Sequence, residues 1–230
     1  STMLPYFEKA ALIGDPTTAS GYSTVITNEF IAELLTNYEM EDVRLKVSGG
    51  GWSNLMQNQL NECVLYFNYR GIYGVSGFSS VHIDNANNGF KLPLATIITC
   101  GTGSFDQHNT SLSEKFLRAG SLSNPKGGIA GIATATLNTH TLFNNIINMG
   151  FYDGIFAHQI ETAGGSLAHG KLTLFNAYPT NPYNWVNAFT QWNNLMGDPS
   201  THLWTDTPIE ISVQFDDEIS FGTNFIDVHV

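Results

Sequence analysis

The chain of 230 residues is poor in cysteine and in charged side chains, and it lacks a long apolar run. Its two cysteines, Cys63 and Cys100, are too few for a framework of disulfide bonds. Lysine and arginine number 9 against 20 acidic residues, so the net charge of −11 argues against a nucleic-acid partner. No stretch approaches the roughly 18 consecutive apolar residues of a membrane span, so none is expected.

Apolar runs with strand character alternate with segments of helical spacing along most of the chain. Expected strands cover residues 9–15, 43–47, 63–69, 94–100 and 127–135. Expected helices cover residues 27–38, 52–62, 113–119, 142–149, 151–161 and 185–196, and residues 74–91 are expected to be loop. This alternation predicts an α/β fold with a parallel sheet covered by helices.

The pattern changes at Thr207. Residues 209–215 alternate between apolar and polar side chains, and a second β-type run covers residues 225–230. Such runs predict a short β-hairpin of half-exposed strands. We therefore interpret residues 1–206 as one α/β unit and residues 207–230 as the first strands of a truncated, sandwich-like domain.

Cys100 is the most informative residue, because it ends the apolar run 94–99 and precedes the glycine-containing loop 101–105. In open α/β sheets, sites form at the carboxyl ends of strands, and a thiol there is a candidate nucleophile. Cys63 is expected to open the strand 63–69 and to pack as a small hydrophobic side chain. The two thiols would then lie roughly 20 Å apart at ~3.3 Å per residue, too far for a disulfide.

Three segments, taken in order, resemble the gingipain-type cysteine peptidases. They are Asn68-Tyr69-Arg70-Gly71, Cys100-Gly101-Thr102-Gly103-Ser104-Phe105, and Met196-Gly197-Asp198-Pro199-Ser200 followed by Leu203-Trp204. The resemblance implies a caspase-like fold, comprising the second catalytic subdomain of that family and the start of an Ig-like domain. It also implies Cys100 as the nucleophile, a peptide or protein substrate, no cofactor, and a bacterial protein that is secreted or displayed at the cell surface.

The chain departs from the family at the catalytic histidine, which aligns with Ile72, and at the following glycine, which aligns with Tyr73. The resemblance implies that the N–H groups of Cys100 and Tyr73 hold the oxyanion. Isoleucine cannot transfer a proton, and losing a positioned acid–base group typically costs about 10²–10⁴-fold in rate. A substitute base would have to come from His140, which follows the fifth strand at the same sheet edge, from His108 or His82, or from a segment outside this sequence.

Three functions therefore remain open. The first is an impaired cysteine peptidase, the second is an inactive pseudoenzyme that keeps the groove to bind a peptide or protein, and the third is a structural module of a secreted multidomain protein. Activity that disappears in Cys100→Ala would separate the first from the others.

Other polar residues allow a functional or a structural interpretation. Asp15 either contacts a substrate side chain or caps the turn before Pro16, and the segment Asp84 to Asn88 is either a calcium loop or, as the lack of EF-hand spacing favours, a plain turn. No group of His, Cys and Asp has zinc-ligand spacing, so His158 and His169 are expected to be surface or capping residues. Trp185, Phe189 and Trp192 have the helical spacing of a packing stripe.

Overall fold

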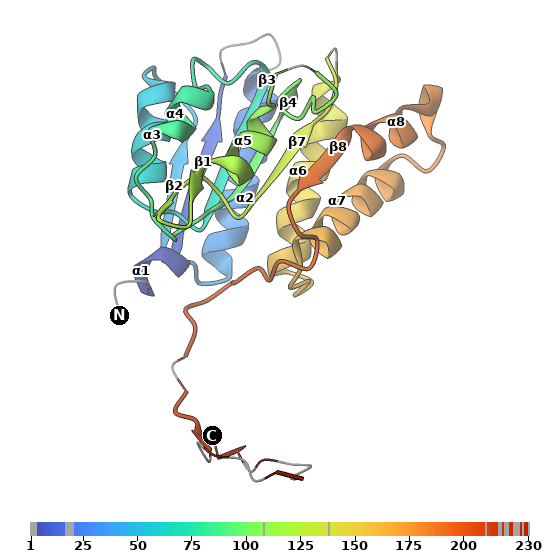
Figure 1. The fold of residues 1–230 in the computed structure, drawn as a ribbon. Coiled ribbons are helices and arrows are strands. Elements are labelled where there is room, and N and C mark those ends of the chain that lie inside the picture. Colours follow the sequence, from blue (N-terminus) through green and yellow to red (C-terminus); the bar gives the residue numbers. More distant parts are fainter. Residues whose placement is uncertain are drawn as a thin grey trace.

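A six-stranded sheet forms the centre of the molecule (Figure 1). The computed structural model describes residues 4–16, 21–107, 109–137, 139–209, 211–215, 218, 221–222, 226 and 228–229. The strand order is β2-β1-β3-β4-β7-β8, in which only the edge strand β8 is antiparallel to its neighbour. The strands are β1 (Lys9–Gly14), β2 (Asp42–Lys46), β3 (Tyr66–Tyr73), β4 (Leu94–Cys100), β7 (Ala130–Thr134) and β8 (Asn193–Met196).

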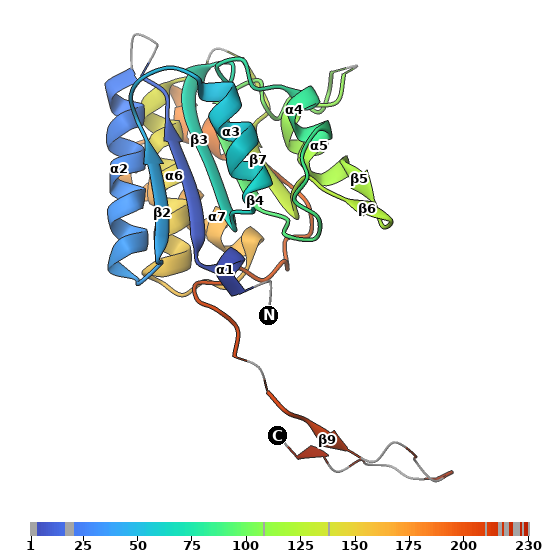
Figure 2. The same ribbon diagram turned by 90° about the vertical axis from the view of Figure 1, so that its left-hand side faces the viewer.

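Helices cover both faces of this sheet, as Figure 2 shows most clearly. One face carries α2 (Gly21–Asn37), α6 (Thr141–Phe156), α7 (Ala163–Ala177) and α8 (Trp185–Trp192). The other carries α3 (Trp52–Asn61), α4 (Ser80–Asp84) and α5 (Leu112–Arg118). Shorter elements are α1 (Leu4–Phe7), β5 (Gly120–Ser121), β6 (Asn124–Pro125) and η1 (Pro182–Asn184). The predicted helix-covered α/β sheet is confirmed.

Two separate hydrophobic cores result, one on each face of the sheet. In β1, Leu12 packs toward the helices α2 and α6, whereas Ile13 packs toward α3. In β4, Ile98 belongs to the same core as Leu12, and Ile97 belongs to the same core as Ile13. Because both faces of these strands are buried, they are apolar almost continuously and do not alternate with polar residues.

Two sequence expectations for the first half of the chain are wrong. Cys63 does not open a strand, because it lies in the turn after α3 with a left-handed φ of 63°, and β3 begins at Tyr66. The segment 74–91 is not all loop, since it contains α4. Both cysteines are free thiols, as expected.

The second half of the chain differs from the sequence prediction where glycines and close helix packing override the local helix propensity. The two helices expected to meet near Gly150 are one continuous helix, α6, because α7 approaches it closely there: a Cβ at Gly150 would lie 3.0 Å from the Cα of Gly170. The helix α7 was not predicted, since its glycines disfavour an isolated helix. The last expected helix ends at Trp192, and the following residues form β8.

The C-terminal segment runs away from the sheet (Figure 1) and contains a short antiparallel pair. There β9 (Gln214–Phe215) pairs with β10 (Val228–His229). This pairing agrees with the expected hairpin, while the division at residue 207 and the Ig-like interpretation stay predictions. Among the described residues, no helix is long and apolar enough to cross a bilayer.

Candidate active site

Cys100 is the last residue of β4 and lies half-buried at the carboxyl edge of the sheet. Arg70 of β3 pairs with Ile98 of β4, and the next recorded pair is Tyr73 with Cys100, so β3 accommodates one extra residue. Such a bulge changes the direction of the side chains around it. The register thus brings the Ile72–Tyr73 segment beside Cys100, where the sequence alignment expects the base and the second oxyanion donor.

The loop after Cys100 is fixed to the segment that follows β7. The N–H of Gly101 donates to the carbonyl of Thr136 at 2.8 Å, and the N–H of Gly103 donates to Thr134 at 3.0 Å. Gly101 has a φ of 75°, and a Cβ there would lie 2.8 Å from a methyl group of Leu137. Glycine is therefore required at 101 both by the left-handed backbone and by the close approach.

A chain of hydrogen bonds leads from the thiol into the protein interior. Cys100 Sγ lies 3.1 Å from Thr139 Oγ1, and that oxygen accepts a hydrogen bond from Asn144 Nδ2 at 3.2 Å. Asn144 Oδ1 in turn accepts from Asn193 Nδ2, and Asn193 Oδ1 accepts from Thr134 Oγ1, both at 3.1 Å. Thr139 Oγ1 accepts a hydrogen bond from the amide, and a hydroxyl that accepts one hydrogen bond can still donate its own O–H, here to the sulfur.

A buried cation, the guanidinium of Arg70, interacts electrostatically with the thiol. The guanidinium of Arg70 donates to the carbonyl of Ile98 at 2.7 Å, to that of Thr141 at 3.0 Å and to Asn145 Oδ1 at 2.7 Å. Burial lowers the pKa of Arg70 to about 9, and the negative charge of a Cys100 thiolate acts against this shift. The guanidinium thus stays protonated at neutral pH and lies within electrostatic reach of Cys100.

Two hollows flank the loop that begins at Gly101. The first, of about 380 Å³, opens on Cys100 and is bordered by α4 and by the start of α5. Its polar side chains are hydroxyls and amides, namely Ser79, Ser80, Thr102, Ser104, Gln107, Asn109, Thr110 and Ser111. We call it the Cys100 groove. The second, of about 390 Å³, lies on the β7 side and includes Asp106 and Leu137.

The candidate bases are engaged elsewhere or lie outside the described residues. His140 is exposed and caps α6, its Nδ1 accepting from the N–H of Leu142 at 3.1 Å. His82 accepts from the N–H of Ser79 at 3.1 Å and stacks on Phe78. His108 lies outside the described residues. Within the described part of the chain, no hydrogen bond joins a histidine to Cys100, and the recorded partner of its sulfur is Thr139.

Asp15 and the segment from Asp84 to Asn88, the two other candidates from the sequence, make contacts that stabilise the fold. Asp15 is buried and accepts a hydrogen bond from the hydroxyl of Tyr69 at 2.8 Å, which ties β1 to β3 below the site. Asp84 forms an ion pair with Lys115 at 2.6 Å. The buried Asn88 donates to two backbone carbonyls at 2.9 Å, as a structural turn would require.

The aromatic residues of α8 pack as predicted. The rings of Trp185, Phe189 and Trp192 contact one another with centroids 5.0–6.1 Å apart. Phe189 is buried in the core shared with α6 and α7. This stripe is therefore part of the packing.

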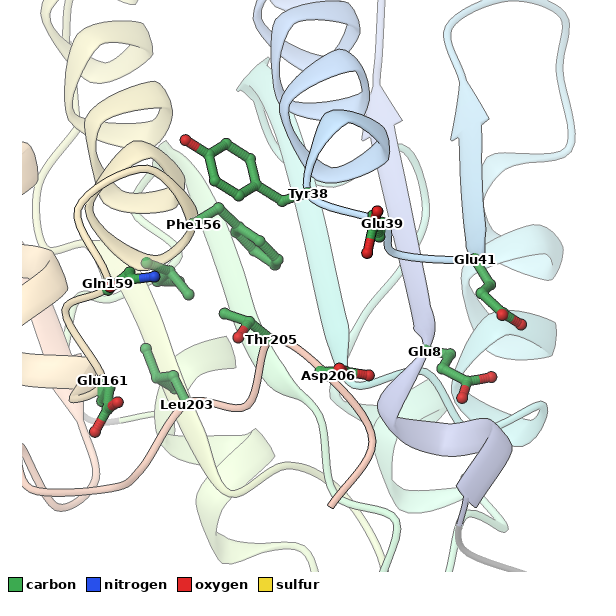
Figure 3. A pocket seen from close by; sticks show the side chains of 11 residues that line it. Glu8, Tyr38, Glu39, Glu41, Phe156, Gln159, Glu161, Leu203, Thr205 and Asp206 are labelled. Atoms are coloured by element: carbon green, nitrogen blue, oxygen red, sulfur yellow. The ribbon is translucent and has the colours of Figure 1, made fainter. Parts of the chain in front are cut away.

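Another hollow, of about 580 Å³, lies at the opposite end of the sheet (Figure 3). It is lined by acidic side chains from Glu8, Glu39, Glu41, Glu161 and Asp206, together with aromatic groups from Tyr38 and Phe156. Its lining within the described part of the chain contains no thiol or imidazole, whereas the smaller Cys100 groove contains a thiol.

The sequence did not identify the residues that surround Cys100. Thr139, Asn144 and Asn193 are ordinary polar residues in the sequence, and only the packing of α6 on the sheet and the pairing of β8 with β7 bring them into one hydrogen-bonded series. The spacing of the asparagines follows no recognised motif. The unusual amount of asparagine was a signal of buried polar contacts, but it could not say where they would form.

Comparison with known proteins identifies the family of the chain. A model of Peptidase family C25 matches residues 4–204. The chain belongs to this family. Among curated proteins, Gingipain R2 of Porphyromonas gingivalis is 23% identical over 231 residues, an alignment covering 95% of this chain and 30% of the relative. Gingipain R1 of the same organism is 23% identical over 216 residues, covering 89% of this chain and 21% of that protein.

Solved structures of C25 relatives have the same fold. The crystal structure of the Arg-specific cysteine proteinase gingipain R aligns with a TM-score of 0.80 at 22% identity, over 97% of this chain and 54% of that one. A complex of the pro- and mature domains of RgpB from Porphyromonas gingivalis gives 0.79 at 21% identity, over 97% and 55%. The chain thus spans less than a third of the curated relatives and about half of the solved chains.

Proposed function

We propose that the chain is a cysteine peptidase domain that hydrolyses peptide bonds with Cys100 as its nucleophile. The observation that carries the proposal is the position of Cys100: half-buried at the carboxyl edge of the sheet, hydrogen-bonded to Thr139 and open to a groove. Membership of Peptidase family C25 supports the same reaction class. A secreted or cell-surface location is part of this proposal.

In the proposed reaction, the thiolate sulfur attacks the carbonyl carbon of the scissile bond. The C–N bond breaks, the amine leaves with a proton, and a thioester remains on Cys100. Water then attacks the thioester, releasing the carboxylic acid and restoring the thiol. The hydroxyl of Thr139 lies within hydrogen-bond distance of the sulfur, and the guanidinium of Arg70 places a positive charge within electrostatic reach of it. The proposal assigns the oxyanion to the N–H groups of Cys100 and Tyr73.

The leaving amine needs a proton that Ile72 cannot supply. His140 and His108 are the two candidate donors. His140 directly follows Thr139, the residue that contacts the thiol, but caps α6 through Nδ1. The neighbours of His108 in the sequence, Gln107 and Asn109, both line the Cys100 groove. Without either group, acylation would be slow by about 10²–10⁴-fold.

The groove also suggests which side chain it would accept. The relative named as Arg-specific acts on a cationic side chain, whereas the described lining of the Cys100 groove offers hydroxyls and amides and no carboxylate. An unpaired cation is costly to desolvate without an opposite charge. We therefore propose an uncharged polar substrate side chain in this groove.

A second candidate function is a pseudo-peptidase that binds a peptide without cleaving it. Ile72 at the expected position of the base, together with a hydroxyl as the recorded partner of the thiol, favours this alternative. The groove and the loop beside it would then bind a peptide or protein, and Cys100 would be dispensable for that binding.

The test uses the full-length protein with a peptide library that contains Arg, Lys, Asn, Gln and Ala at the cleaved position, analysed by mass spectrometry. Cleavage that is lost in Cys100→Ala supports the peptidase, and its loss in His140→Gln or His108→Gln identifies the proton donor. A preference for Arg would contradict the proposed specificity. Absence of cleavage with peptide binding retained in Cys100→Ala supports the pseudo-peptidase. Neither cleavage nor binding would contradict both proposals.

A further inference from the structure

Three potential metal ligands meet far from Cys100, where α6 ends beside α7. Asp153 lies in the last turn of α6, His158 follows that helix, and His169 belongs to α7. One ligand atom from each lies within 4.8 Å of the other two. Sequence spacing did not reveal this group, because the third member is brought in by helix packing.

We propose that Asp153, His158 and His169 form a zinc site that links α6 to α7. Asp153 Oδ2 lies 3.1 Å from His169 Nε2 and 3.4 Å from His158 Nε2. Ligand atoms about 2.0–2.1 Å from a tetrahedral zinc ion lie roughly 3.3 Å from one another. Both carboxylate–imidazole distances therefore already match those of zinc ligands.

The backbone around this group holds the side chains in place. The N–H of His158 donates to the carbonyl of Asp153 at 3.1 Å, and the N–H of Ile160 donates to Gly154 at 2.9 Å, so the chain folds back over the end of α6. A Cβ at Gly154 would lie 3.1–3.2 Å from the imidazole and Cβ of His169. Glycine at 154 therefore leaves the room that the ring of His169 occupies against α6.

The two imidazole rings approach the same carboxylate oxygen, with their centroids 4.6 Å apart. Two neutral imidazoles and one carboxylate are a usual ligand set for zinc, which completes its shell with water. The exposure of His158 leaves that fourth position accessible to solvent.

The experiment measures zinc binding by the whole chain after removal of metal with EDTA. We expect one zinc ion per chain and, at about a hundred times the Kd, a rise in Tm of roughly 5–10 °C. Magnesium and calcium should leave Tm unchanged, because they prefer sets of oxygen ligands. Cobalt(II) should give the visible spectrum of N/O ligation without a thiolate charge-transfer band, which separates this site from Cys63 and Cys100.

The decisive variant is His158→Gln, since this side chain is exposed and its replacement should not disturb the metal-free fold. Zinc affinity should fall by more than about 100-fold. Loss of a residue that only hydrogen-bonds to a metal ligand already lowers metal affinity by about 10–100-fold, and His158 is proposed as a ligand itself. The matched control is His202→Gln, which changes a histidine that lies near Glu161 outside the cluster. Equal zinc binding by both variants, no zinc binding by the wild type, or a thiolate band with cobalt would each overturn the proposal.

Discussion

The ends of β3 and β4 lie side by side, yet they are held by different kinds of groups. Next to Cys100, the end of β4 is supported by neutral hydroxyls and amides: Thr139, Asn144, Asn193 and Thr134. The strand β3 is held largely by ionisable groups, including Tyr66, Tyr69 and the buried Arg70. At the edge itself, β3 offers Ile72 and the exposed Tyr73.

This difference separates two requirements of a thiol enzyme. Forming and orienting a thiolate needs a hydrogen-bond donor and a nearby positive charge, for which Thr139 beside β4 and Arg70 of β3 are available. Releasing the amine needs a group that can give up a proton, and the isoleucine at position 72, where the sequence resemblance expects the family's histidine, cannot do so. The first requirement can therefore be met structurally while the second is not met at the position expected from the family.

Alkali is expected to give the largest effect, through buried phenols that include Tyr66 and Tyr69 of β3. Burial raises the pKa of Tyr6, Tyr66, Tyr69 and Tyr152. Folded-state pKa values above the ordinary value of 10.0 mean that the unfolded state loses protons first. The stability from these phenols is therefore fully present below pH 10.0 and is lost as the pH rises, by up to about 1.4 kcal/mol per group and pH unit.

Urea unfolding between pH 8 and pH 11 measures this loss, which should reach several kcal/mol at the upper end. The variant Tyr152→Phe is the control, because it removes one titrating group and should make the dependence on pH shallower. A free energy of unfolding that stays constant up to pH 11 would contradict the assignment of these phenols as buried and protonated.

The next largest effect is expected from Ile72→His. If the end of β3 lacks only a proton donor, restoring an imidazole beside Cys100 should raise the rate of peptide cleavage by about 10²-fold or more. The rate is measured with the best peptide from the library, and Ile72→Asn serves as a polar control without an acid–base group. An equal rate in both variants would show that the defect does not lie at residue 72.

The smallest effect is expected on the β4 side, from Thr139→Val. This change keeps the shape of the side chain and removes the hydroxyl that lies 3.1 Å from Cys100 Sγ. A hydrogen bond to a charged group contributes about 1.5–3 kcal/mol, so alkylation of Cys100 by iodoacetamide at neutral pH should slow at least about tenfold. Thr139→Ser should keep most of the rate. Alkylation of Cys63 is measured separately in Cys100→Ala and subtracted. Unchanged alkylation in Thr139→Val would mean that the hydroxyl does not support the thiolate.

Local sequence was a good guide to the strands and a poor guide to the helices that cover one face. The run 94–100 could be assigned to a buried strand ending in a thiol, and β4 has those bounds. The helix α7 could not be predicted, because its glycines are useful only where α6 packs against them. In the same way, Asn193 was assigned to a helix, although it lies in the edge strand β8 and supports Asn144.

The sequence by itself determined the α/β class, the family and the position of Cys100 at a strand end, because periodicity, glycines and ordered motifs are local properties of the chain. Only the tertiary structure decided what surrounds that thiol. The hydrogen bonds from Thr139 to Asn193 and the meeting of His158 with His169 join residues from different elements. Such contacts depend on how helices pack on the sheet, and the spacing of two residues along the chain does not give the distance between their side chains.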